Sequence, residues 1–291
     1  MKQYTSLYFV GAGGIGMSAL VRYFLAKGYK VAGYDRTQSP LTTELKTEGL
    51  EIVYEESVES IPDYCRNPET TLVVYTPAIP ASHAGLVYFR EHGFRVVKRA
   101  ELLGLITQSS KGLCFAGTHG KTTTSSMAAH IFHESPIGCN AFLGGILRNY
   151  NSNLILSEQS PFTVIEADEY DRSFHWLHPY MAVVTATDPD HLDIYGTEEA
   201  YLESFARFTS LIQPGGCLIM KKGIKLVPSV KENVKIYTYS ARDGGDFHAG
   251  NIRIGDGTIV FDFVMPEGSV ADIELGVPVE INIENAVAAM A

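Results

Sequence analysis

The chain has 291 residues, a formal net charge of −10, 45% hydrophobic residues and 19% charged residues. This composition is typical of a globular protein with a sizeable core, and the length predicts two domains. The acidic balance argues against a nucleic-acid partner, because a polyanion needs a basic surface. The sequence has no secretion signal, no CxxC pair and no run near the roughly 20 apolar residues of a membrane span. We therefore expect a cytoplasmic protein with no membrane partner.

The first part of the chain alternates predicted strands with predicted helices. Apolar strands are predicted at 6–10, 29–35 and 71–76, and a helical pattern covers 15–28. This alternation predicts a Rossmann-like parallel α/β sheet. A further helix and a polar connector follow, and we place a domain boundary after residue 108. The first predicted domain is therefore 1–108.

A second α/β series fills residues 109–291. It begins with a strand, a glycine loop and a helix, in the manner of a P-loop ATPase. Two apolar segments at 162–171 and 180–191 each end in acidic residues, and a helix is predicted at 197–212. Short β-type segments dominate from 216 to about 276. The sequence thus predicts a central ATP-binding domain with additional β-strands.

The N-terminal glycines form a phosphate-binding pattern. Gly11, Gly13 and Gly16 match G-x-G-x-x-G between a predicted strand and a predicted helix, and Asp35 ends the next strand. In this pattern a diphosphate meets the helix N-terminus and the acid binds a ribose diol. A nicotinamide dinucleotide and a UDP conjugate both carry these groups. An NAD-dependent oxidoreductase therefore remains an alternative at this point.

The second glycine loop, GTHGKTTT at 117–124, has the features of a triphosphate site. Lys121 would reach the β- and γ-phosphates, and the hydroxyl of Thr122 can bind Mg²⁺. The loop departs from the standard pattern, because Phe115 stands where GxxxxGK[ST] has its first glycine. A nucleotide loop alone does not define a reaction. A switch protein that only binds a nucleoside triphosphate is therefore a further alternative.

Acidic residues follow the two next predicted strands. Glu166 and Asp168 follow one strand, and Asp190 and His191 follow the next. Ligands of open α/β sheets bind at this carboxyl edge, and Mg²⁺ prefers carboxylate and water oxygens. The sequence therefore predicts that these groups support the phosphate loop. The nearby Trp176 could line the site or belong to the core, and a lone tryptophan favours the interpretation as a core residue.

Several of these motifs together indicate a family. GTHGKTTT, EADEYDRSF, DPDHLD and the NIEN near the end resemble the Mur ligases of peptidoglycan synthesis. GAGGIGMSAL, YTPAI and RAELL resemble the branch that joins L-alanine to UDP-N-acetylmuramate. The resemblance extends over essentially the whole chain. It implies an ATP-driven amide synthesis through an acyl phosphate, with ATP and Mg²⁺ as cofactors and the two small molecules as substrates.

The resemblance also implies roles for individual residues. In catalysis it implicates Lys121, Glu166, His191 and His119. Nucleotide binding is implied for Gly117, Thr118, Gly120, Lys121, Thr122, Thr123, Asn282 and Asn285. The UDP substrate is expected at Gly13, Gly14, Ile15, Gly16, Ser18, Asp35, Thr76 and Ala78. Metal binding is implied for Thr122, Glu166 and His191.

The chain departs from the family pattern in three places. Ile281 replaces the histidine that commonly precedes the first asparagine, and no lysine lies between 151 and 220, where several members carry a carbamylated one. By this resemblance we also expect the third, amino-acid-binding domain of the family to lie outside these 291 residues. We therefore expect a fragment with little activity of its own, present as a monomer or weak homodimer. A murein peptide ligase, which attaches a recycled tripeptide, remains an alternative because the missing domain selects the amine.

Overall fold

The computed structural model describes residues 3–242, 244–255, 257–276 and 279–291. The chain divides into two compact units. Unit 1 contains Met1–Ile106 together with Gly144–Leu156, and unit 2 contains Thr107–Leu143 together with Ser157–Ala291. The segment 144–156 therefore groups with the N-terminal part of the chain, whereas the sequence had assigned it to the second domain.

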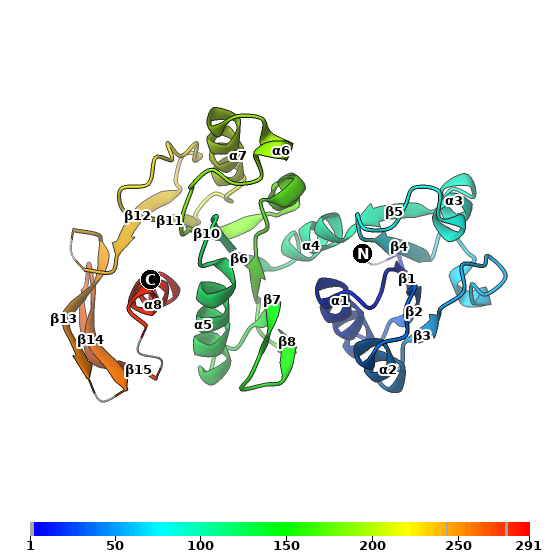
Figure 1. Cartoon of the computed structure of the whole chain (residues 1–291), viewed down its shortest axis with the longest axis horizontal. Coiled ribbons are helices and arrows are strands. Elements are labelled where there is room, and N and C mark those ends of the chain that lie inside the picture. The colour runs from blue at the N-terminus through cyan, green and yellow to red at the C-terminus, as the bar shows by residue number, and fades with distance from the viewer. Residues whose placement is uncertain (1–2, 243, 256, 277–278) are drawn as a thin grey trace. The chain divides into compact units, whose positions relative to one another are not determined.

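Unit 1 contains a five-stranded parallel sheet in the order β3-β2-β1-β4-β5 (Figure 1). The strands are β1 (Ser6–Val10), β2 (Lys30–Tyr34), β3 (Glu51–Val53), β4 (Thr71–Tyr75) and β5 (Arg95–Lys98). The helices are α1 (Ile15–Ala26), α2 (Pro40–Thr47), α3 (Ala84–Glu91) and α4 (Arg99–Thr107). The strand order reverses beside β1, and such a switch point is where open α/β sheets bind ligands.

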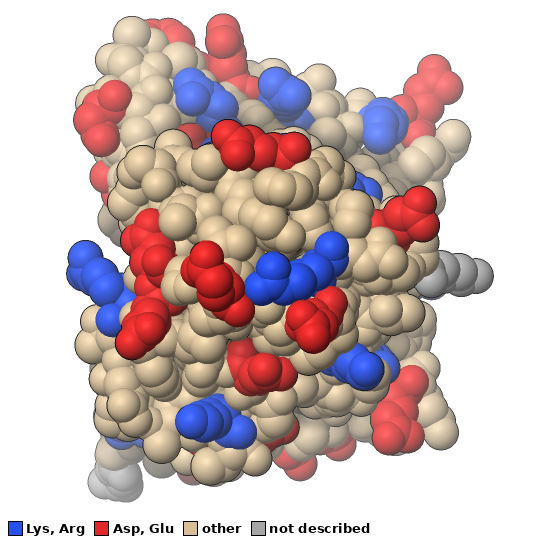
Figure 2. All heavy atoms as spheres, turned by 90° about the vertical axis from the view of Figure 1, so that its right-hand side faces the viewer, with Lys and Arg blue, Asp and Glu red and all other residues tan. Residues whose placement is uncertain are grey.

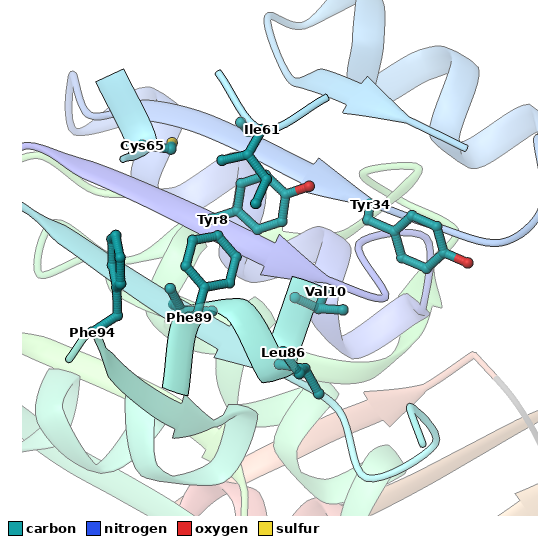
Figure 3. Packing of buried hydrophobic residues seen from close by; sticks show 10 residues of the cluster. Tyr8, Val10, Tyr34, Ile61, Cys65, Leu86, Phe89 and Phe94 are labelled. Atoms are coloured by element: carbon teal, nitrogen blue, oxygen red, sulfur yellow. The ribbon is translucent and has the colours of Figure 1, made fainter. Parts of the chain in front are cut away.

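The core of unit 1 explains why β1 is central. Every residue of β1 is buried, as expected for a parallel strand covered on both faces. Tyr8 of β1 packs against Phe89 of α3 with ring centroids 5.0 Å apart, and Phe89 packs against Phe94 at 4.9 Å (Figure 3). This aromatic cluster fixes α3 against the sheet. The loops at the carboxyl edge are thereby held on a rigid base.

The second sheet has the order β15-β14-β13-β12-β11-β10-β6-β9-β7-β8, and its strands belong to unit 2 except for β8 and the end of β7, which fall in the segment 144–156. Pairing is parallel from β7 through β9, β6, β10, β11 and β12 to β13, and antiparallel from β13 through β14 to β15. The first five strands in chain order are β6 (Lys111–Ala116), β7 (Asn140–Leu147), β8 (Ser152–Ile155), β9 (Phe162–Glu166) and β10 (Pro179–Val184). The others are β11 (Cys217–Lys221), β12 (Lys235–Ser240), β13 (Phe247–Gly255), β14 (Thr258–Met265) and β15 (Gly268–Leu275).

The helices of unit 2 include the last helix of the chain, which packs against the first helix of this unit. They are α5 (Lys121–Glu134), α6 (Leu192–Tyr195), α7 (Glu198–Ser210) and α8 (Ile281–Met290). Helix α8 packs between α5 on one side and the strands β12 and β13 on the other (Figure 1). The α/β architecture with a parallel-sheet domain and a second mixed sheet is as predicted.

Two surface features complete the description. Basic and acidic side chains are interspersed on the face shown in Figure 2, so lysine and arginine do not gather there into one patch.

Trp176 is 48% exposed, which shows that its interpretation as a core residue was wrong. It lies in the 3-10 segment Tyr170–Trp176, where neighbouring Phe174 takes the buried position instead. Within the described ranges, no helix combines the length and apolar character needed to cross a membrane.

Candidate nucleotide and phosphate sites

The loop between β6 and α5 requires its two glycines. Gly117 has a φ of +139°, and a Cβ there would lie 2.2 Å from Thr185 Oγ1 and 2.8 Å from the backbone nitrogen of Ala186, just after β10. Gly120 has a φ of +84° and is the N-cap of α5. A glycine N-cap offers no side-chain oxygen, so the backbone N–H groups of the first turn point toward a prospective anion.

The departure from the standard P-loop pattern has a structural reason. Phe115, which stands at the position of the first glycine, is still inside β6 and is 3% exposed. It pairs in register with Glu166 of β9. The strand therefore runs further than the pattern assumes, and the turn is made by the residues from Gly117 onward.

The loop is tied down to the strand beside it. Thr118 N–H donates to the carbonyl of Ala186 at 3.1 Å, and the Thr118 hydroxyl lies 2.7 Å from the carbonyl of Asp188. The hydroxyl of Thr185 donates to the His119 carbonyl at 2.5 Å. Residue His119 itself is exposed. Through these contacts Thr118 stabilises the loop, which is held against the residues that follow β10.

Lys121, at the first position of α5, donates to acceptors on the loop and on the segment after β9. Its Nζ donates to the carbonyl of Gly117 at 2.7 Å and lies 2.9 Å and 2.8 Å from the two carboxylate oxygens of Glu169. Glu169 is only 1% exposed, and burial raises its pKa while Lys121 opposes the rise. Glu169 was not among the residues predicted for the site, although its place in the acidic run after β9 was a usable signal.

Thr122 and Glu166 form a pair of oxygen ligands. The Thr122 hydroxyl donates to the Glu166 carboxylate at 2.9 Å, which brings together two of the three residues predicted to bind metal. A hydroxyl and a carboxylate oxygen suit Mg²⁺, which keeps several waters and phosphate oxygens in its shell. Across the described residues, no group of three His, Cys, Asp or Glu side chains could hold a metal ion. The pair therefore fits a magnesium ion whose remaining ligands come from solvent and substrate.

His191 lies in an unusual backbone conformation after β10. Its φ is +53°, and its ring packs edge-on against Tyr170 with centroids 5.2 Å apart. Its Nε2 lies 3.8 Å from a carboxylate oxygen of Asp190. Asp171 and Arg172, after β9, also have positive φ values of 52° and 54°. Such conformations in non-glycine residues cost energy and cluster at functional sites.

The two asparagines near the end of the chain reach the loop from α8. Asn285 is 8% exposed, and its Oδ1 accepts from the Thr124 hydroxyl at 3.3 Å. A Cβ on Gly120 would lie 2.9 Å from the same Oδ1. The side-chain amide of Asn285 donates to Asn282 Oδ1 at 3.3 Å. Asn285 therefore lies beside the first turn of α5, where Thr123 is exposed, and Asn282 is joined to it by this hydrogen bond.

The N-terminal glycine loop in unit 1 is organised differently. Gly13 N–H donates to Asp35 Oδ2 at 2.7 Å, and Thr37 N–H donates to Asp35 Oδ1 at 3.2 Å. The predicted ribose-binding acid is thus engaged by the backbone of the loop itself. Gly14 is the N-cap of α1, so the helix again begins without a capping side chain.

The remaining residues predicted in unit 1 surround this loop. Gly11 has a φ of +88°, and a Cβ there would lie 2.7 Å from Thr76 Cγ2. Ala78 is exposed in the turn that follows Thr76, and Ile15 is 48% exposed. Ser18 is buried, and its hydroxyl donates to the Ile15 carbonyl at 2.7 Å.

Arg99 is a cation that the sequence analysis did not place at this loop. A Cβ on Gly16 would lie 2.7 Å from Arg99 Nη1, so the guanidinium is beside the first turn of α1. Guanidinium groups match the geometry of phosphate oxygens. Arg99 belongs to the RAELL motif, which indicated only a resemblance. Arg99 and Gly16 are more than 80 residues apart in the chain, so the sequence did not show that they lie close together.

Two family models match this chain. A model of the Mur ligase middle domain matches residues 115–291, and a model of the Mur ligase family catalytic domain matches residues 6–111. The chain belongs to the Mur ligase family. The prediction from GTHGKTTT and the accompanying acidic motifs is confirmed.

Among curated relatives, a UDP-N-acetylmuramate–L-alanine ligase of Parabacteroides distasonis is 67% identical over 291 residues, which are 100% of this chain and 63% of that protein. A protein of the same name from Phocaeicola vulgatus is 66% identical over 286 residues, covering 98% of this chain and 62% of that protein. The chain thus spans somewhat less than two thirds of the length of these relatives.

Solved structures of Mur ligases share the fold. The UDP-N-acetylmuramate-alanine ligase of Thermotoga maritima superposes with a TM-score of 0.80 at 24% identity, covering 98% of this chain and 64% of that one. A UDP-N-acetylmuramate:L-alanyl-γ-D-glutamyl-meso-diaminopimelate ligase of Neisseria meningitides gives 0.83 at 21% identity, covering 99% and 92%. At these identities the likeness concerns the fold.

Proposed function

We propose that the protein to which this chain belongs joins L-alanine to UDP-N-acetylmuramate at the expense of ATP, in peptidoglycan synthesis. The observation that carries the proposal is 67% identity across all 291 residues to a ligase of that name. The two glycine loops support it, because the reaction requires two phosphate-bearing substrates. Within the whole protein, this chain would hold the UDP-sugar and the nucleotide.

Unit 2 would bind Mg·ATP through the loop at the start of α5. The backbone N–H groups after Gly120 and the ammonium of Lys121 would neutralise phosphate oxygens. Thr122 and Glu166 would hold one magnesium ion, and His191 would help with a second. Asn282 and Asn285 would lie toward the adenine base of ATP. His119 would face the substrate.

The chemistry has a simple requirement. A carboxylate is a poor electrophile, and the γ-phosphoryl group of bound ATP would convert it to an acyl phosphate that an amine can attack. Phosphoryl transfer depends mainly on positioning and charge neutralisation. The residues that the structure gathers at the end of β6 and β9 are suited to those two tasks. Thr185 and Thr118 would keep the loop backbone in place through their hydrogen bonds, and Thr118 would also face the nucleotide.

Unit 1 would bind the UDP portion at the start of α1. The residues from Gly13 to Ser18 would surround the diphosphate, and the helix N-terminus would favour its negative charge. Asp35 is held by Gly13 N–H, so it would orient the loop as well as face the ribose. Arg99 would add the positive charge that the glycine loop itself lacks.

Calorimetric titration of this chain tests the binding assignments. We expect saturable binding of UDP-N-acetylmuramate, separate saturable binding of a non-hydrolysable ATP analogue with Mg²⁺, and no saturable binding of NADH. Gly14→Arg should abolish binding of the UDP-sugar and leave nucleotide binding intact. Saturable NADH binding without UDP-sugar binding would instead support an oxidoreductase.

Phosphate release by the full-length protein tests the reaction. Release should require both UDP-N-acetylmuramate and L-alanine, and should be lost on chelation of divalent cations. The tripeptide L-alanyl-γ-D-glutamyl-meso-diaminopimelate is the matched competitor. Release with the tripeptide but not with L-alanine would assign the protein to murein peptide recycling instead.

A further inference from the structure

The ion pair between Lys121 and Glu169 is not explained by the roles assigned above. Both carboxylate oxygens of Glu169 lie within 2.9 Å of the Lys121 ammonium. The side chain of Glu169 is 2% exposed and that of Lys121 is 15% exposed. The contact joins the loop after β6 to the segment after β9, between residues 48 positions apart. A buried carboxylate so close to a phosphate-binding lysine therefore needs a role of its own.

Glu169 is fixed by its own segment as well. The Tyr195 hydroxyl donates to its backbone carbonyl at 2.5 Å, and Arg172 N–H donates to the same carbonyl at 3.0 Å. Arg172 places its guanidinium over the Tyr195 ring at 4.7 Å. The backbone of Glu169 is thus held in place by two hydrogen bonds to its carbonyl, independently of Lys121.

We propose that Glu169 is a positioning residue that holds the Lys121 ammonium on the loop until a phosphate group competes for it. This inference rests on the proposed nucleotide site in unit 2. The pair keeps the loop preformed and electrically neutral at its lysine when no nucleotide is bound. It also lowers the affinity for phosphate groups in general, so that binding depends on the magnesium ion and the other contacts of the correct nucleotide.

The negative charge of Glu169 determines whether its removal should raise or lower the affinity for phosphate groups. An ammonium has three N–H donors, and two are directed at the Gly117 carbonyl and at Glu169. Glutamine at 169 could still accept a hydrogen bond from Lys121, and the Gly117 carbonyl would remain. Position is thus largely kept in Glu169→Gln, whereas a negative charge near the incoming phosphates is removed. Because charges a few ångströms apart in a partly buried site interact strongly, removal of the repulsion should dominate.

The first test is calorimetric titration of this chain with ADP in the absence of metal. Glu169→Gln should bind ADP about ten-fold more tightly than the unchanged chain. Asp193→Asn is the matched control, because Asp193 is an exposed acid at the start of α6 on the same edge of the sheet. It should change the affinity less than about two-fold.

The second test measures the reactivity of Lys121 without nucleotide. The chain is treated briefly with an amine-acylating reagent, and acetylation at each lysine is quantified by peptide mass spectrometry. In the unchanged chain Lys121 should react more slowly than the exposed Lys231. In Glu169→Gln the ratio should rise several-fold, because the ammonium loses the buried carboxylate that holds it against the loop. This readout in the unchanged chain remains available if the variant fails to fold.

The outcomes separate this inference from the proposed function. If the unchanged chain does not bind ADP or the ATP analogue, the nucleotide assignment is overturned. If it binds both, and Glu169→Gln leaves the affinity unchanged or weakens it, Glu169 is a structural or supporting residue and the inference is overturned. Acetylation of Lys121 as fast as Lys231 in the unchanged chain would also overturn it.

Discussion

The two glycine loops of this chain look alike in sequence but are built from different parts. In unit 1 the loop is bound to the acid that follows β2, since Gly13 N–H donates to Asp35, and Arg99 of α4 lies beside Gly16. In unit 2 the loop carries its own cation, Lys121, and that cation is held by the buried Glu169 from the segment after β9. The first arrangement suits holding a diphosphate that does not react. The second places an ammonium, a hydroxyl and carboxylates together, as transfer of a phosphoryl group requires.

The largest expected effect is that of Gly117→Ala. The new Cβ would meet Thr185 Oγ1 and the backbone of the neighbouring strand, and the φ of +139° is strained for alanine. We expect the free energy of unfolding to fall by about 3 kcal/mol, measured by urea denaturation, with loss of binding of the ATP analogue. Unchanged nucleotide binding would show that the loop does not form the site.

Replacing the lysine separates the two loops functionally. Lys121→Met removes a charged hydrogen-bond donor of similar length, so the affinity for the Mg·ATP analogue should fall about 100-fold. Binding of UDP-N-acetylmuramate should remain within about two-fold, because the other loop has its own contacts. Calorimetry with both ligands on the same variant measures the difference. A parallel loss of both affinities would contradict the division of roles.

Two adjacent glycines in unit 1 provide a matched pair for folding. A Cβ on Gly13 would lie 2.6 Å from Thr42 Cγ2 and 2.8 Å from Asp35 Oδ2, whereas a Cβ on Gly14 would have its nearest neighbour at 3.8 Å. Gly13→Ala should therefore destabilise the chain by about 2 kcal/mol, and Gly14→Ala by less than about 1 kcal/mol. Equal losses in urea denaturation would show that the loop adjusts freely around Asp35.

The smallest effect concerns His83, a buried residue of unit 1. It caps α3 by accepting from Leu86 N–H, its Nε2 has no hydrogen-bond partner among the described residues, and burial lowers its pKa. The unfolded chain takes up this proton near pH 6.5, so the stabilising contribution of the neutral form is complete above that pH and is lost as the pH falls below it. His83→Asn, which keeps a capping side chain, should lose less stability than the unchanged chain between pH 7.5 and 5.5. An equal loss in both would exclude this role.

The sequence by itself determined the α/β class, both glycine loops and the family. Strand–loop–helix order and the acidic run after β9 are local patterns, so they can be recognised in the sequence without knowledge of long-range contacts. The positions of Glu166 and Lys121 relative to strand ends followed from this order, because the carboxyl ends of parallel strands lie at one edge.

Only the tertiary structure decided which side chains meet. The pairing of Lys121 with Glu169, the approach of Arg99 to Gly16 and the contact of Asn285 with Thr124 join residues far apart in the chain. It also assigned 144–156 to unit 1 and left Trp176 exposed. These outcomes depend on how elements pack on one another, which residue spacing does not encode, because burial and strain are properties of neighbours in space.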